Sequence, residues 1–314
     1  MIRYVAGRVG QALLVLAATF TAAFLLLQAL PGDAIMIKFM SSDMAFTAEQ
    51  LADIRASYGA DLPIWQQYLH TLGNFLTGNF GYSIQAGVPV RQQLATNLPP
   101  TLQLASLGLL MAVVLTVAIA ALSNMVGFGW LRAAIQSLPS LFVSVPVFWL
   151  GIMLIQVFSF QLGLVSVISP GPVERLILPV LTLAIPISAP LAQVLMRNID
   201  EVLAQPFVAV ARAKGASRNW VLWKHVARNA VLPTLTIAGV LFGELLAGAV
   251  VTEAVYGLNG LGGLTNQAVG NHDTAVLQAI VVISALAFVT INLAVDLLYP
   301  VLDPRLGSKL GISA

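Results

Sequence analysis

Long apolar runs separated by polar segments dominate the hydropathy pattern of this chain. Val9–Leu30 contains no charged residue. As an α-helix its roughly 22 residues cover about 33 Å, which is enough to cross a bilayer. Five further runs of this type follow along the chain. The pattern therefore predicts six membrane-spanning helices, at Val9–Leu30, Thr101–Leu122, Ile135–Phe160, Leu176–Leu195, Val231–Val251 and Val276–Leu298.

The first run follows Arg3 and Arg8, so it begins in the way a signal peptide does. A cleavable signal peptide has a shorter apolar region, of roughly 7 to 15 residues, and a small-residue cleavage site. We therefore interpret this run as a retained membrane span.

Prolines concentrate in and near the third and fourth predicted spans, at Pro139, Pro146, Pro179, Pro186 and Pro190. Proline removes a backbone hydrogen bond, but neighbouring helices of a bundle can satisfy the carbonyl groups that it frees. We expect kinks in these two spans.

The composition agrees with the apolar pattern. Hydrophobic residues make up 58% of the chain and charged residues 9%, with a mean hydropathy of +0.89. A soluble domain is closer to about a quarter charged, so the sequence predicts an all-α polytopic membrane protein. The net charge of +2 is too small to indicate nucleic acid as a main partner. The absence of cysteine excludes disulfides, thiolate metal sites and cysteine nucleophiles.

Lys and Arg are distributed unequally between the segments that connect the spans. With the N-terminus in the cytoplasm, eleven of the fifteen basic residues fall in cytoplasmic segments and four in outer ones. Cytoplasmic loops of membrane proteins carry an excess of Lys and Arg. We therefore expect both termini and the connection Met196–Ala230 in the cytoplasm, and the long connection Pro31–Pro100 outside the membrane.

Sequence signatures of enzymes and metal sites are missing from the chain. It has no G-x-x-x-x-G-K-[ST] phosphate loop and no G-x-S-x-G nucleophile motif. His70, His225 and His272 lie far apart, without the spacing of zinc ligands. We expect no catalytic residue, no metal site and no cofactor in this chain, which is then not an enzyme.

One segment concentrates the charge that the rest of the chain lacks. Ala211–Asn229 holds five of the fifteen basic residues and no acidic one, together with Trp220 and Trp223. The residues alone leave two interpretations open. Aromatic anchors among basic residues suit a docking surface for a protein, and they also suit a basic loop held at anionic lipid.

This segment has the local signals of two short helices around a turn. Pro206 suits a first-turn position, and Gly215 permits the helix to stop. Ser217 can cap the helix that follows. Trp220 and Trp223 are three residues apart and so share a face of that second helix.

The residues Ala209-Val210-Ala211-Arg212-Ala213-Lys214-Gly215 resemble the EAA loop of ABC importer permeases, and H-x-x-R-N-A-x-L-P from His225 resembles the dipeptide/oligopeptide/nickel permease family. In that family the loop is a cytoplasmic helix pair that inserts into a groove on an ATPase subunit. The resemblance assigns ATPase coupling to Ala209, Ala211, Arg212, Ala213, Lys214, Gly215, Arg218, Trp220, Trp223, His225 and Arg228. It implies that Arg212, Lys214 and Arg218 pair with acidic groups around that groove.

Further motifs of the same family occur along nearly the whole chain, in the family's order and spacing. They are Leu30-Pro31-Gly32-Asp33, Gly78-Asn79-Phe80-Gly81-Tyr82-Ser83, Leu98-Pro99-Pro100-Thr101-Leu102, the segment from Glu253 through Gly260-Leu261-Gly262 to Asp273, Asp296-Leu297-Leu298-Tyr299 and Leu302-Asp303-Pro304-Arg305. We expect Asp296, near the inner end of the last span, to pair with Arg305 or with a neighbouring helix.

Four positions depart from the family pattern. Ala209 replaces the Glu that names the EAA loop, and Tyr256, Asn259 and Gly263 replace a usual Phe, Pro and Arg. The last three lie in the predicted outer region, where solute enters. They leave the class of solute more open than the mechanism.

The resemblance implies a type I ABC importer permease fold with six transmembrane helices. The implied organisation is an N-terminal helix at 1–30, an extracytoplasmic segment at 31–100, a transmembrane domain at 94–300 with its coupling loop at 196–230, and a cytoplasmic tail at 301–314. Implied partners are a second homologous permease, two ATPase subunits that bind ATP and Mg, an extracytoplasmic solute-binding protein and the lipid bilayer. The implied location is a bacterial or archaeal plasma membrane.

Acidic residues in and near the spans, Glu244, Glu253 and Asp273, are candidates for the translocation path. Glu244 falls within the fifth predicted span, where an ionised side chain costs roughly 2.5–3.5 kcal/mol or more near the centre. It either lines the path and meets a peptide amino group or a metal complex, or it is buried, protonated or paired between helices. For Glu253 the alternative role is to order the glycine-rich turn 257–263.

The implied function is import of di- or oligopeptides as one half of an ATP-driven translocation path. The same machinery importing nickel, a metal chelate or a haem-like solute is the alternative within the class. A secondary transporter without an ATPase would more often show an inverted repeat of broken helices, and none is visible in the sequence. A membrane scaffold without a path is a third interpretation.

Overall fold

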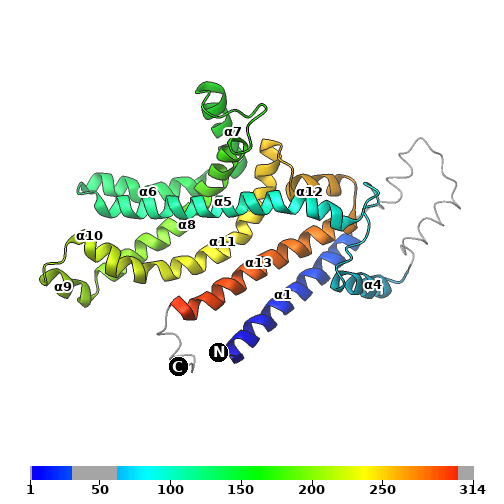
Figure 1. Cartoon of the computed structure of the whole chain (residues 1–314), viewed down its shortest axis with the longest axis horizontal. Helices are drawn as coiled ribbons and strands as arrows, with labels where there is room; N and C mark the ends of the chain where they lie inside the picture. The colour runs from blue at the N-terminus through cyan, green and yellow to red at the C-terminus, as the bar shows by residue number, and fades with distance from the viewer. Residues whose placement is uncertain (1, 30–61, 303–314) are drawn as a thin grey trace. The chain divides into compact units, whose positions relative to one another are not determined.

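A computed structural model describes residues 2–29 and 62–302 of the chain, and in these residues the regular structure is helical apart from an isolated β-bridge between Tyr82 and Pro89 (Figure 1). The helices are α1 (Ile2–Gln28), α4 (Ile64–Leu76), α5 (Val90–Met125), α6 (Gly129–Ser144), α7 (Val147–Leu154), α8 (Glu174–Leu203), α9 (Pro206–Ala213), α10 (Arg218–Val221), α11 (Ala227–Tyr256), α12 (Leu261–Gly270) and α13 (Thr274–Leu302), with π-helical segments at Ile155–Gln161 and Leu222–Val226.

Among the described residues, five helices are long and apolar enough to cross a membrane, and they confirm five of the six predicted spans. They are α1, α5, α8, α11 and α13. The predicted span Ile135–Phe160 is instead the pair formed by α6 and the run Val147–Gln161, which meet at an angle of 106°. The described residues thus contain up to six candidate crossings, if this bent pair counts as one.

The break in the bent pair has a local cause at Pro146. Val145 has an extended backbone, with φ −96° and ψ 121°, between the end of α6 and the start of α7. A residue before proline is driven out of the helical region because the proline ring clashes with it. Pro179, Pro186 and Pro190, by contrast, lie inside the uninterrupted helix α8.

The described residues form two compact units, of which the first takes those within 1–9, 102–256 and 290–314. Helix α8 lies at its centre, since 61% of the most apolar window of this helix is buried and α8 packs on α6, α7 and α11. Small residues allow the close approach. A Cβ added at Gly108 or Gly248 would stand 3.2 Å or 3.1 Å from side-chain atoms of Leu183. Such small-residue contacts are typical of helix packing in membranes.

Tyr256 stands where a Phe is usual in the permease family that the sequence resembles, and its hydroxyl connects three helices of this unit by hydrogen bonds. Its hydroxyl lies 2.9 Å from the hydroxyl of Thr182 on α8, and it donates to the carbonyl oxygen of Gly151 on α7 at 3.2 Å. A buried hydroxyl needs such partners, because an unpaired polar group is costly away from water. The hydroxyl group that distinguishes Tyr256 from Phe therefore contributes to the contacts between these helices.

The second unit takes the described residues within 10–101 and 257–289. Its core consists of aliphatic side chains from the start of α5, from α12 and from the start of α13, including Val90, Leu94, Leu261, Leu264 and Val276. Among the buried polar residues of this unit is Asp273, which is 2% exposed. Buried polar groups are rare in such cores, and the contacts of Asp273 are described below.

Candidate functional site

The basic helix pair, which we define as residues 206–226, folds with the local signals that its sequence carries. Pro206 begins α9, and Gly215 follows its end with a φ of +87°. The Gly215 N–H donates to Arg212 at 2.9 Å and the Ala216 N–H donates to Ala211 at 3.2 Å. This pair of bonds is the Schellman arrangement, which requires a left-handed residue at the position of Gly215. The predicted helix start and stop are confirmed.

The second helix of the pair begins at its predicted cap. The Trp220 N–H donates to the hydroxyl oxygen of Ser217 at 3.3 Å, and the Val221 N–H donates to the Ser217 carbonyl at 3.0 Å. From Leu222 the turns widen into the π-helical segment Leu222–Val226, which continues into α11. The pair is therefore continuous with a long apolar helix and is not a detached loop.

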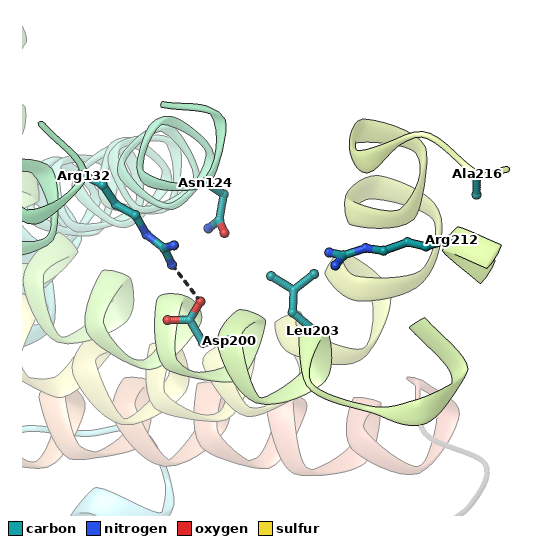
Figure 2. A pocket seen from close by; sticks show the side chains of 6 residues that line it. All are labelled: Asn124, Arg132, Asp200, Leu203, Arg212 and Ala216. Atoms are coloured by element: carbon teal, nitrogen blue, oxygen red, sulfur yellow. Dashed lines mark hydrogen bonds and ion pairs between the residues drawn. The ribbon is translucent and has the colours of Figure 1, made fainter. Parts of the chain in front are cut away.

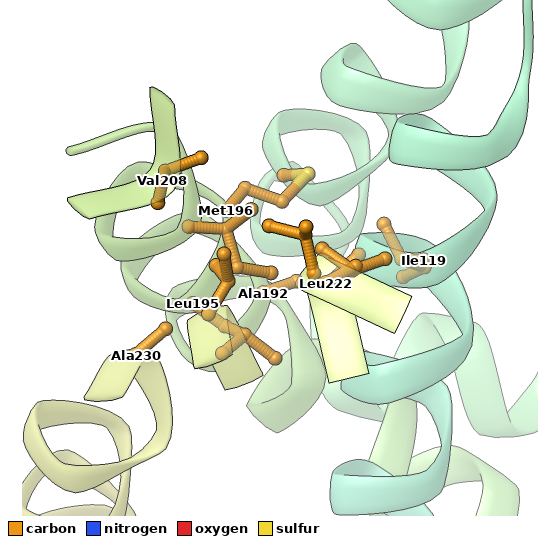
Figure 3. Packing of buried hydrophobic residues seen from close by; sticks show 11 residues of the cluster. Ile119, Ala192, Leu195, Met196, Val208, Leu222 and Ala230 are labelled. Carbon is orange, nitrogen blue, oxygen red and sulfur yellow. The ribbon is translucent and has the colours of Figure 1, made fainter. Parts of the chain in front are cut away.

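One face of the basic helix pair is aliphatic and buried against the ends of long helices. Val208, Val221, Leu222 and Val226 pack into a cluster, as part of the set drawn in Figure 3. The other members of this cluster come from three long helices, α5, α8 and α11, and are Ile119, Ala120, Ala192, Leu195, Met196, Ile199 and Ala230. A close-packed cluster of this kind transmits displacement because it has few voids to absorb it.

The opposite face is exposed, aromatic and basic. Trp220 and Trp223 are 49% and 56% exposed, and Phe207 and Val210 of α9 are exposed as well. The ring of His225 lies between the two helices, with its centroid 4.9 Å from that of Trp220 and 6.4 Å from that of Phe207. We call Phe207, Val210, Trp220 and Trp223 the aromatic face. Clustered exposed apolar side chains of this type mark an interaction site.

Lys214 and Lys224, which are both exposed, add positive charge to this part of the chain. The basic helix pair itself contains no acidic residue that would neutralise them. Among the predicted residues, Ala209 and Ala213 are also exposed, whereas Ala211 packs against the buried cluster. Arg218 and Arg228 fall in α10 and α11, and their side chains lie outside the described part of the structure.

Arg212 is set apart from the two lysines. Figure 2 shows its side chain pointing from α9 into a pocket of about 450 Å³, toward Leu203. Arg132 and Asp200 form an ion pair at 3.1 Å in the wall of this pocket. Arg212 and the two lysines belong to one basic segment of the sequence, but their side chains thus have different surroundings.

Phe207 and Val210 belong to the aromatic face, and the sequence analysis did not single them out. Their spacing offers a signal, because Phe207, Val210 and Lys214 are three and four residues apart and so lie along one side of α9. Val208, between them, is 1% exposed and points into the buried cluster. Helical periodicity within the eight residues of α9 would have found this face.

The three acidic candidates for a path have unlike surroundings. Glu244, near the middle of the span Asn229–Tyr256, is exposed on the surface of α11. Glu253 is 1% exposed and makes polar contacts within the fold. Asp273 is buried: it accepts from the Ser83 hydroxyl at 2.5 Å and from the Val276 N–H at 3.4 Å. Of the three, Glu244 is the carboxylate that the fold leaves on an open surface.

Asp296 confirms the expectation that it pairs with a neighbouring helix. Its carboxylate lies 3.3 Å from the guanidinium of Arg8 on α1. The other partner considered, Arg305, lies outside the described residues. This ion pair joins α13 to the first turns of α1 within the first unit.

Comparison with known proteins adds independent information. The family model described as binding-protein-dependent transport system inner membrane component matches residues 107–308, and the model of its N-terminal part matches residues 1–105. The glutathione transport system permease protein GsiC of Escherichia coli K12 is 34% identical over 287 residues, which cover 91% of this chain and 92% of that protein. The probable peptide ABC transporter permease protein y4tP of Sinorhizobium fredii is 34% identical over 311 residues, which cover 96% and 98%.

Solved structures support the fold. The chain matches the methionine ABC transporter MetNI in an inward-facing conformation with a TM-score of 0.57 at 18% identity, over 68% of this chain and 97% of that one. It also matches an amino acid ABC transporter solved with histidines, with a TM-score of 0.53 at 20% identity, over 66% and 93%. At these identities the likeness concerns the fold alone.

Proposed function

The chain belongs to the family of binding-protein-dependent transport system inner membrane components, and from this premise we propose that it couples an ABC importer to its ATPase subunits through the basic helix pair. It is a permease of such an importer and a multi-span helical membrane protein. The two-faced structure of the basic helix pair is the observation that carries the proposal.

In this proposal the aromatic face docks on the ATPase. Trp220 and Trp223 supply large, nearly rigid contact areas, and exposed Trp is the residue type most enriched among interface hot spots. Lys214 and Lys224 favour an acidic rim on the partner. ATP and Mg²⁺ are bound by that partner, so this chain contributes no hydrolytic chemistry.

The buried face of the basic helix pair would transmit the movement of the ATPase subunits to the membrane-spanning helices. Closure of the ATPase subunits moves whatever is docked on them, and the basic helix pair is packed on α5, α8 and α11 through its aliphatic cluster. Because Gly215 and Ser217 fix the angle between the two short helices, the pair moves as one body. The long helices would then alternate between two arrangements, one open to each side.

This function requires the basic helix pair and both termini on the cytoplasmic side. The excess of Lys and Arg in the segments assigned to that side supports this orientation. A second permease of the same family would complete the path, and a solute-binding protein would deliver solute from outside. The family description, an inner membrane component, supports an inner-membrane location.

We further infer that the solute is a small peptide. The names of the two relatives specify glutathione, which is a tripeptide, and a peptide. Peptides carry an amino group, and the exposed Glu244 offers a carboxylate near the middle of α11 that would attract it. Nickel, a metal chelate or a haem-like solute is the alternative cargo for the same machinery.

The test is co-expression of the chain with its genomic neighbours and co-purification with any ATPase subunit among them, followed by an ATPase assay. We expect Trp220→Ala to weaken the complex by roughly 30-fold, which corresponds to a hot-spot loss of about 2 kcal/mol. The matched control is Trp149→Ala on α7, because Trp149 is similarly exposed, at 47%, and lies outside the basic helix pair. This variant should bind the ATPase like the unmodified chain.

An unmodified chain that inserts correctly and binds no ATPase would contradict the proposal. The basic helix pair would then be a loop held at anionic lipid, and the result would favour a secondary transporter as the function of the chain. Equal losses in Trp220→Ala and Trp149→Ala would show that the aromatic face is not the docking surface.

A further inference from the structure

Helix α4 (Ile64–Leu76) is fixed along one end of α1, within the second unit. The Tyr68 ring lies 5.6 Å from Phe20 and 5.4 Å from Phe24, between centroids. The Tyr68 hydroxyl is 2.9 Å from that of Thr21, and Gln28 donates to Gln67 at 2.6 Å. Since these α1 residues lie toward the C-terminal end of the candidate span Val5–Gln28, α4 is held against that end of the span.

A second apolar stripe on α4 is not used in this contact. Trp65, Leu69 and Leu76 are 62%, 57% and 81% exposed. Their spacings of four and seven residues place them on one side of a helix. Gln66 and His70 lie on a different side, which is polar, and α4 has no Lys, Arg, Asp or Glu.

We propose that this stripe, formed by Trp65, Leu69 and Leu76, lies against lipid at the membrane interface, so that α4 is an interfacial helix. Apolar side chains are also exposed near the same end of the spanning helix, at Leu25 and Leu26 of α1. Trp is enriched at the boundary between headgroups and acyl chains, where its ring is amphipathic.

The chemistry of α4 also specifies how it binds lipid. Many interfacial helices combine an apolar face with Lys and Arg that attract anionic headgroups. Helix α4 has no basic residue, so burial of the apolar stripe supplies the attraction. Its position is therefore independent of the charge of the lipid. The inference needs α1 to span a membrane, but it does not need ATPase coupling or a particular solute.

The experiment uses the absence of cysteine from the natural chain. Leu69→Cys and its neighbour His70→Cys each give a single site for a nitroxide spin label, one on the stripe and one on the polar side. The labelled chain, assembled with its partner subunits, is reconstituted in phosphatidylcholine bilayers. Electron paramagnetic resonance then measures collisions with oxygen, which partitions into lipid, and with a neutral nickel chelate, which stays in water.

We expect the ratio of oxygen to nickel collisions to be several-fold higher at Leu69→Cys than at His70→Cys. The ratio should not change when a third of the lipid is replaced by anionic phosphatidylglycerol. Frequent nickel collisions at both sites would overturn the proposal, because the stripe would face water. Few collisions with either reagent at Leu69→Cys, with an immobile label, would overturn it in favour of a protein partner.

A second measurement avoids a label on the stripe. Trp65 becomes the single tryptophan when Trp130, Trp149, Trp220 and Trp223 are replaced by Phe. Brominated phosphatidylcholine quenches an indole that contacts its acyl chains. We expect strong quenching of Trp65, and fluorescence that brominated lipid leaves unchanged would overturn the proposal.

Discussion

Gly215 holds a backbone conformation that residues with a side chain rarely adopt, at the point where α9 turns into α10. Its φ is +87° and its N–H donates to Arg212. No heavy atom lies within 4 Å of the place where a Cβ would stand. A substitution at Gly215 therefore acts through backbone strain and not through a steric clash.

We expect Gly215→Ala to cost roughly 1–2 kcal/mol, because an L-residue is strained in the left-handed region. Gly215→Pro should do more, since it also removes the N–H and cannot adopt this φ. Both variants should lower the solute transported per ATP hydrolysed in proteoliposomes while insertion stays intact. Gly129→Ala is the matched control, because Gly129 also has open space around it and has no positive φ. Normal transport by a correctly assembled Gly215→Pro variant would contradict the coupling role.

Basic residues that are close together in the basic helix pair have different surroundings, which the sequence did not indicate. Arg212 and Lys214 are two positions apart, yet Arg212 points into the pocket beside the Arg132–Asp200 ion pair. Side chains two apart on a helix do not share a face. A charge-reversal experiment on the docking surface is therefore better directed at Lys214 and Lys224.

At the scale of elements, the proposed function gives the two faces of the basic helix pair separable tasks. The aromatic face is available for a partner, whereas the aliphatic face holds the pair against three long helices. Loss of an exposed contact weakens association with a partner. Loss of a buried contact loosens the pair from the bundle and leaves the docking residues in place.

Leu222→Ala tests this separation from the buried side. Truncation of a buried Leu costs roughly 2–5 kcal/mol through lost transfer energy and a cavity. We expect the ATPase to remain bound and the solute transported per ATP to fall several-fold. Leu264→Ala in the second unit is a matched control, because Leu264 and Leu222 are 8% and 7% exposed. It should lower thermal stability similarly while the transport ratio is maintained, and equal uncoupling by both variants would exclude a specific role of the pair.

For the whole molecule, one side of the spanning helix α11 bears on the proposed second permease. Val240, Glu244 and Val251 are exposed on this spanning helix, at spacings of four and seven residues that place them on one side. An ionised Glu in contact with lipid near the centre of a span costs several kcal/mol. An ionised Glu244 would therefore need a water-filled path or another chain beside it, both of which the proposed second permease would provide, and the alternative is a protonated side chain.

Glu244→Gln tests the path. An ammonium–carboxylate hydrogen bond contributes roughly 1.5–3 kcal/mol, and about 1.4 kcal/mol changes an equilibrium tenfold. We expect the assembled importer to prefer a dipeptide over its N-acetyl derivative by at least about tenfold, and the variant to lose this preference. Glu201→Gln is the control, since Glu201 is exposed and pairs with Arg197. An unchanged preference in Glu244→Gln would place the carboxylate outside the path.

Much of this architecture was determined by the sequence alone. Apolar runs of span length predict α1, α5, α8, α11 and α13, because in a bilayer each backbone polar group must be satisfied within its own helix. Pro206, Gly215 and Ser217 predict the bounds of the short helices, since caps and turns depend on neighbouring residues. Motifs in order along the chain indicated the family.

Tertiary structure decided the remaining features, because they depend on residues far apart in the sequence. Val208 is buried and Val210 is exposed, because Val208 belongs to the buried cluster that also contains residues of the long helices and Val210 does not. Asp273, a candidate for the path, accepts a hydrogen bond from Ser83, 190 residues away. Pro146 stands at a helix break while Pro186 lies inside a helix, so the presence of proline alone did not predict which helix is interrupted. Local chemistry specifies each element, and packing between elements decides which side chains remain available for function.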